Sequence, residues 1–136
     1  MPNSLAVLAL NQFEKLEKFN QHRRKLAWFY YQGLKNTKFK LVPEKKDREN
    51  VFLRFTVRHE KAHQIIKKAW QKNILIGDWY TSLIAPNDTK LEKFGYNAGD
   101  CLIAEKLAKQ TLNLPTHINI SQNQAKKIIE FLKQWK

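Results

Sequence analysis

The chain has 136 residues, a length typical of one domain, and its formal net charge is +13 at pH 7. Hydrophobic residues make up 43% of it, which excludes a disordered chain, and no apolar stretch reaches the roughly 18 residues of a membrane span. The single cysteine excludes an internal disulfide, and the first residues lack the basic segment of a secretory signal, so we expect a cytoplasmic protein.

The first predicted element is one long amphipathic helix over residues 3–34. Apolar side chains recur at spacings of mostly three and four from Leu5 to Leu34, with Pro2 at a tolerated N-terminal position. A helix of about 30 residues is long for a domain of this size. The segment is therefore expected to lie across, or project toward, a missing partner.

Short strands and a helix are predicted for the middle of the chain. Residues 39–42 form a short strand that ends at Pro43, and 44–50 form a charged loop. Residues 51–58 alternate, which predicts a strand with Val51, Leu53, Phe55 and Val57 on one face. A helix over 60–72 and a strand over 74–76 follow. The inward stripe of that helix is expected to comprise Ala62, Ile65, Ile66, Ala69 and Trp70.

Residues 78–99 break every periodic pattern and form a long loop that carries Trp79 and Tyr80. Loops of this length in compact domains are usually functional or disordered. Its aromatic side chains are expected either to contact a ligand or neighbouring domain, or simply to fill the core.

Two helices complete the chain. Asp100 is the expected cap of a helix over 101–111, and residues 114–118 read as extended. Ser121 and Gln124 form a capping box that opens the last helix. The apolar face of the first of these helices comprises Ala104, Leu107, Ala108 and Leu112, and that of the second Ala125, Ile128, Ile129, Leu132 and Trp135.

These elements predict a single α/β domain of α+β-like character. A long helix over residues 1–34 precedes a small domain over 35–136, in which a small mixed sheet is covered by helices.

Catalytic constellations are missing from the sequence. The glycines are scattered, which excludes a glycine-rich phosphate loop. His59 and His63 are four residues apart and could pair on a metal, but no third ligand is apparent. Cys101, beside a predicted helix start, is expected to be a small buried residue. We predict no catalytic, cofactor-binding or metal-binding residue.

The positive charge raises the question of nucleic acid as a partner. Lysines lie in every segment and greatly outnumber arginines, whose bidentate fork suits base and phosphate recognition better. A solvated lysine-rich surface is therefore the preferred interpretation, and a basic nucleic-acid-binding module is kept as an alternative.

Six runs of residues, in order and with matching spacing, carry a family resemblance: 4–16, 22–24, 52–58, 74–77, 99–108 and 112–121. Together they resemble the small C-terminal domain of the DegT/DnrJ/StrS (sugar aminotransferase-like) family of pyridoxal-phosphate (PLP) enzymes. The resemblance covers nearly the whole chain. It implies the fold of the C-terminal domain of fold-type I PLP enzymes, and a chain truncated at its start relative to the family.

The resemblance also implies which parts of the enzyme the chain lacks. In the family, the preceding domain supplies the Schiff-base lysine and the groups that bind the cofactor, so this chain is expected to bind no PLP alone. Tyr80 aligns with a tyrosine near the family's substrate pocket, which makes Trp79 and Tyr80 substrate-side candidates. The family's Pro-Leu-His that often follows is replaced by residues 82–86, which leaves the substrate class open.

The leading hypothesis is therefore a C-terminal domain or fragment of an aminotransferase, inactive alone. It would help to close the substrate pocket and support dimer packing, with a cofactor-binding domain, and a second copy of the chain, as expected partners. The alternative within the family is a split enzyme, in which a separate cofactor-domain chain docks on the first helix.

Overall fold

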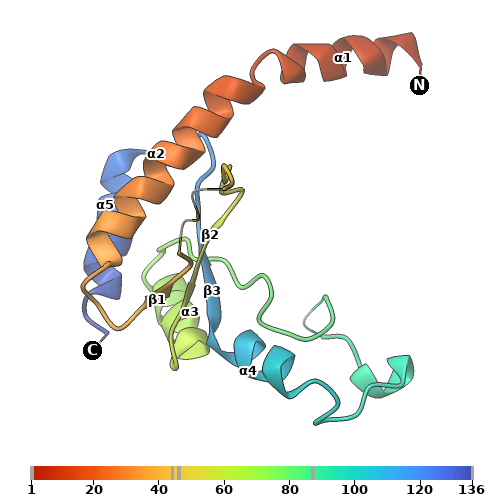
Figure 1. Cartoon of the computed structure of the whole chain (residues 1–136), viewed down its shortest axis with the longest axis vertical. Coiled ribbons are helices and arrows are strands. Elements are labelled where there is room, and N and C mark those ends of the chain that lie inside the picture. The colour runs from red at the N-terminus through yellow and green to blue at the C-terminus, as the bar shows by residue number, and fades with distance from the viewer. Residues whose placement is uncertain (1, 44, 46, 87, 136) are drawn as a thin grey trace.

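A computed structural model of the chain describes residues 2–43, 45, 47–86 and 88–135 (Figure 1). Across these residues the elements follow in the order α1 (Asn3–Phe13), α2 (Leu16–Leu34), β1 (Lys40–Leu41), β2 (Phe55–Arg58), α3 (Ala62–Gln71), the 3₁₀ turn η1 (Leu91–Phe94), α4 (Leu102–Gln110), β3 (Thr111–Leu114) and α5 (Gln122–Leu132). The strands form one sheet in the order β1-β2-β3. The predicted small α/β fold is confirmed, although both strand pairs are antiparallel where a mixed sheet was expected.

One face of the sheet forms the core. Phe55 pairs with Leu114 and Val57 with Leu112, and all four side chains are buried on the same face. Tyr30 from α2 contacts the ring of Phe55 at 5.7 Å between centroids, and its hydroxyl donates to the Pro115 carbonyl at 2.9 Å. Burial raises the pKa of Tyr30, so the phenol stays protonated and keeps this bond.

Helices α2 and α5 lie side by side over this core (Figure 1). The predicted capping box of α5 is confirmed. The Ser121 hydroxyl accepts from the Gln124 backbone N–H at 3.2 Å, and the Gln124 side chain accepts from the Ser121 backbone N–H at 2.8 Å. The predicted inward stripe of α5 is confirmed from Ala125 to Leu132, and Trp135 is half-buried against Phe131.

The predicted helix over 3–34 is wrong in its continuity, because α1 ends at Phe13 and α2 begins at Leu16. The Lys15 N–H bonds to the Gln12 carbonyl at 3.1 Å, an i→i−3 contact that tightens the turn between them. Figure 1 shows α1 reaching away from the rest of the molecule, and none of its residues is buried. Without packing on α1, nothing in this part of the molecule fixes one straight helix.

The predicted strand over 51–58 is wrong before Phe55. Phe52 has a φ of 48°, which breaks the alternation of faces. Its ring therefore lies near Phe55, while Leu53 and Val51 are exposed. The buried hydroxyl of Thr116 is within hydrogen-bond distance of the Phe52 carbonyl at 2.7 Å and the Leu53 carbonyl at 2.9 Å, which holds this bend.

Two predictions around α3 need correction. Residues 74–76 form no strand in the described structure, where a single bridge joins Gly77 to Asn113. Trp70 is exposed rather than inward, because its indole N–H donates to the Ile76 carbonyl at 2.7 Å. The rest of the predicted stripe of α3 is buried.

The predicted boundaries around α4 also change. Asp100 does not cap this helix; its carboxylate accepts from the Asn97 N–H at 2.8 Å, and the N-cap residue is Cys101. Cys101 is exposed, so the expectation of a buried cysteine is wrong. Of the expected apolar face, Ala108 is the buried residue within the helix, while Leu112 belongs to β3, which precedes the predicted extended segment. In the part of the chain described, no helix is both long and apolar enough to cross a membrane.

Candidate functional site

The second face of the sheet is polar. Register pairs Thr56 with Asn113 and Lys40 with Arg58, so these side chains share the face opposite the core. The loop that begins at Gly77 starts at the open edge of β3, where Gly77 bridges Asn113 through two backbone hydrogen bonds of 2.7 and 3.0 Å. Candidate functional residues gather at both ends of this face.

Asn113 fastens the loop to the sheet. Its side-chain amide donates to the Trp79 carbonyl at 2.6 Å, and its side-chain carbonyl accepts from the Thr56 hydroxyl at 2.8 Å. Only 1% of Asn113 is exposed, so neither bond competes with water. The position of Trp79 is thus set by a buried residue of β3.

Trp79 and Tyr80 do not fill the core, because they are 51% and 70% exposed. Their rings meet edge to face at 6.2 Å, and Tyr80 has a φ of 64°, unusual for a residue with a side chain. They line a cavity of about 680 Å³, within the range of ligand pockets. Its lining comprises Asp78, Trp79, Tyr80, Ser82, Leu83, Ala85 and Pro86.

Arg54 is the residue at this site that the sequence analysis did not single out. Its guanidinium carbon lies 4.0 Å from the centre of the Trp79 ring, a cation–π contact. Its Nε is buried and has no hydrogen-bond partner among the described residues. The predicted alternation of residues 51–58 puts Arg54 on the face opposite Val51, Leu53, Phe55 and Val57, but its contact with Trp79 depends on tertiary structure. The arrangement places a cation against Trp79, one of the two aromatic side chains that line the cavity.

The other end of the polar face holds His59, which is buried against Phe39 at 4.7 Å between ring centroids. Its Nδ1 accepts from the Lys61 backbone N–H at 3.0 Å. His63 lies on α3 with its Nε2 3.3 Å from the Ala108 carbonyl. Among the described residues, no group of three or more His, Cys, Asp or Glu could hold a metal ion.

Acidification is expected to destabilise the chain through His59. Burial is the largest cause that lowers the pKa of His59 below 6.5; Glu60 opposes this, while Lys61 and Lys38 add to it. The contribution to stability is therefore complete above the unfolded pKa of 6.5 and is lost as the pH falls through the lower folded value. Urea unfolding of the wild type and of His59→Asn between pH 7.5 and 5 measures the difference. A variant that loses stability as steeply as the wild type would contradict this role, and His117→Asn, at an exposed histidine, is the control.

The described residues do not provide a PLP site. Such a site needs a lysine held in an enclosed pocket, where its pKa is lowered and the cofactor phosphate is bound. Every lysine side chain in the described part of the chain is exposed. The residues present therefore do not fit the cofactor without further protein around them.

The fold matches those of solved aminotransferases. DesV of S. venezuelae, in complex with a ketimine intermediate, shares 26% identity over 96% of this chain with a TM-score of 0.81. The proposed sugar aminotransferase Spr1654 of Streptococcus pneumoniae, in its PLP form, shares 21% over 98% with a TM-score of 0.85. A DegT DnrJ EryC1 StrS aminotransferase from Brucella abortus shares 20% over 93% with a TM-score of 0.75.

This chain spans only about a third of these relatives: 35% of DesV, 35% of Spr1654 and 33% of the Brucella abortus enzyme. No protein with a curated description matches it. The model of the DegT/DnrJ/EryC1/StrS aminotransferase family, however, matches residues 1–133. The resemblance inferred from the sequence is confirmed, and the chain belongs to the DegT/DnrJ/EryC1/StrS aminotransferase family.

Proposed function

We propose that this chain acts as the C-terminal portion of a PLP-dependent aminotransferase and is inactive without a cofactor-binding domain. In this proposal the cofactor-binding domain covers α1, and the loop with Trp79 and Tyr80 closes one side of the substrate pocket. The observation that carries the proposal is the uncovered apolar surface of α1. Family membership and the share of the relatives that lies outside the matched part both support the proposal.

The apolar side chains of α1 lie all round its axis, rather than along the single stripe that the sequence spacing predicted. At about 100° per residue, its exposed large apolar side chains point in different directions around the axis. These are Leu5, Val7, Leu8, Leu10 and Phe13. A helix that is hydrophobic all round is normally buried within a larger protein. A second protein surface is therefore the natural environment of α1, and the cofactor-binding domain is the occupant that we propose.

Two further surfaces support the finer parts of the proposal. The cavity at Trp79 has the size of a ligand pocket, and the Arg54 guanidinium stacks on the Trp79 ring that lines it. Leu102 and Ile103 on α4 are exposed and offer apolar contact for a homodimer. In this proposal the loop with Trp79 and Tyr80 closes the substrate pocket, and α4 packs in the dimer.

Co-expression of this chain with the cofactor-binding domain encoded in frame with it or beside it is expected to yield a complex that catalyses transamination. After borohydride reduction, mass spectrometry should place the PLP adduct on the partner domain, while the chain alone gives no stoichiometric adduct. Leu8→Asp should reduce co-purification at least tenfold, because it places a charge in the apolar contact. Gln64→Asp, at an exposed site on α3, is the matched control.

Three results would contradict the proposal. A stoichiometric adduct at one lysine of the isolated chain would show that it forms a cofactor site by itself. Absence of any encoded cofactor-binding domain would remove the proposed partner. A Leu8→Asp variant that co-purifies as well as the control would remove α1 as the docking surface.

A further inference from the structure

We propose that the hollow around His59 binds a small phosphate-bearing anion, of the size of a diphosphate or a phosphate ester. The hollow lies at the end of the polar sheet face and shares no lining residue with the cavity at Trp79. This inference does not rest on the proposed aminotransferase role.

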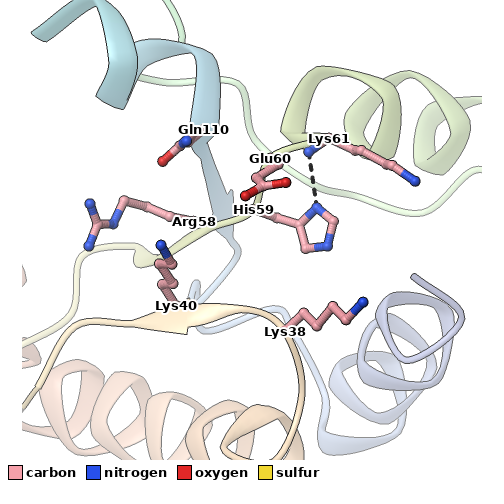
Figure 2. A pocket seen from close by; sticks show the side chains of 7 residues that line it. All are labelled: Lys38, Lys40, Arg58, His59, Glu60, Lys61 and Gln110. Carbon is pink, nitrogen blue, oxygen red and sulfur yellow. Dashed lines mark hydrogen bonds between the residues drawn. The ribbon is translucent and has the colours of Figure 1, made fainter. Parts of the chain in front are cut away.

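The lining of the hollow has a strong excess of positive charge. Its volume is about 450 Å³, which accommodates a small ligand. Among the described residues that line it, the cationic ones are Lys38, Lys40, Arg58 and Lys61, and Glu60 is the only carboxylate (Figure 2). With His59 neutral, three positive charges remain uncompensated. Such a site favours an anion that carries two or more charges.

Two of these cations lie opposite each other on the neighbouring strands β1 and β2. Lys40 and Arg58 are direct partners in the β1–β2 register, so their side chains leave the same face. Like charges directly opposite each other destabilise a strand pair. Among the ion pairs of the described residues, none joins a carboxylate to Lys38, Lys40, Arg58 or Lys61. A bound anion between Lys40 and Arg58 would turn this repulsion into attraction.

His59 supplies a directed hydrogen-bond donor. Because Nδ1 accepts from the Lys61 N–H, the neutral ring carries its proton on Nε2. Figure 2 shows the ring between the side chains of Lys38 and Lys61. Contact with Phe39 fixes the ring plane, so the donor is held in place before a ligand arrives. The Gln110 amide adds a neutral polar group to the lining.

A compact phosphate group fits these features better than a nucleic acid does. The cations surround one hollow and do not follow a stripe along which a polymer backbone could run. A phosphate offers several acceptor oxygens to lysines, a guanidinium and an N–H donor at once. A monocarboxylate would leave most of the positive charge uncompensated.

The test is isothermal titration calorimetry of the 136-residue chain with inorganic diphosphate at fixed ionic strength. We expect saturable binding with one site, weakened about tenfold in Lys40→Gln and in Lys61→Gln, because each removes a charge-assisted hydrogen bond. Arg58→Gln should weaken binding more. Lys127→Gln, an equal change of net charge at an exposed site on α5, should leave the affinity unchanged.

The two lysine variants keep the test independent of folding, since both side chains are exposed while Arg58 is half-buried. Equal loss of affinity for diphosphate in Lys40→Gln and Lys127→Gln would overturn the proposal. It would mean that the net positive charge of the whole chain, and not the hollow, attracts the anion. Absence of diphosphate binding would also overturn it. If diphosphate does not bind but the lysine variants lose affinity for a single-stranded oligonucleotide, the hollow would instead be assigned to a nucleic acid.

Discussion

Asn113→Ala is expected to lower the free energy of unfolding by about 3 kcal/mol. The substitution removes two hydrogen bonds at once and leaves the Trp79 carbonyl and the Thr56 hydroxyl without their buried partner. An unsatisfied buried polar group costs about 1–3 kcal/mol, and the lost side-chain volume adds to this. Urea unfolding followed by far-ultraviolet circular dichroism measures the change.

Matched substitutions separate the role of Asn113 from a general effect of losing an asparagine. Asn119→Ala, at an exposed position, should change stability by less than about 0.5 kcal/mol. Thr56→Val should cost about 1 kcal/mol, because it removes one of the two bonds and keeps the shape.

The loop itself provides a second measurement on Asn113→Ala. Cleavage within residues 77–99 by a low concentration of protease should be faster in the variant than in Asn119→Ala, since Trp79 loses its anchor on the sheet. Equal cleavage rates, together with equal stabilities, would show that Asn113 does not fasten the loop.

Helices were the part of the fold that the sequence predicted best. The capping box at Ser121 and the apolar stripes of α3 and α5 depend on residues three or four apart, so a single window contains the whole signal. The break at Lys15 was missed because its cause is tertiary. Helix α1 has no packing partner in this part of the molecule, while α2 packs on α5.

Strands were predicted less well because their ends depend on distant contacts. Phe52 leaves the extended conformation where Thr116, 64 residues further along the chain, contacts its carbonyl. Alternation of apolar and polar residues says nothing about such a bend.

The candidate site was predicted only in part. The length and composition of the loop at 78–99 drew attention to Trp79 and Tyr80, and both are exposed beside a cavity. Arg54 and Asn113 were missed, because both act through contacts with Trp79, which is 34 residues from Asn113. One feature of the sequence could have indicated Asn113: it is a polar residue between two leucines, in a segment that forms a fully buried strand.

Gly33→Leu is expected to destabilise the chain by about 2 kcal/mol through the contact between α2 and α5. A Cβ at Gly33 would lie 2.7 Å from Ile129 Cδ1 and 2.8 Å from Ile129 Cγ2. Overpacking of a core costs about 1–3 kcal/mol, and the higher helix propensity of leucine offsets up to about 1 kcal/mol. Gln21→Leu, at an exposed position of α2, carries no such clash and should leave stability within about 0.5 kcal/mol.

The partner of Gly33 makes the prediction specific. Ile129→Ala alone should cost about 2–4 kcal/mol, because Ile129 is buried and its loss leaves a cavity. In the double variant the new leucine occupies that cavity, so the combined loss should fall short of the sum of the two single losses by more than about 1 kcal/mol. Urea unfolding of the four proteins measures this interaction energy. Additive losses would mean that α2 and α5 do not contact each other at Gly33 and Ile129. The cost of a side chain at Gly33 would then not come from a clash with Ile129.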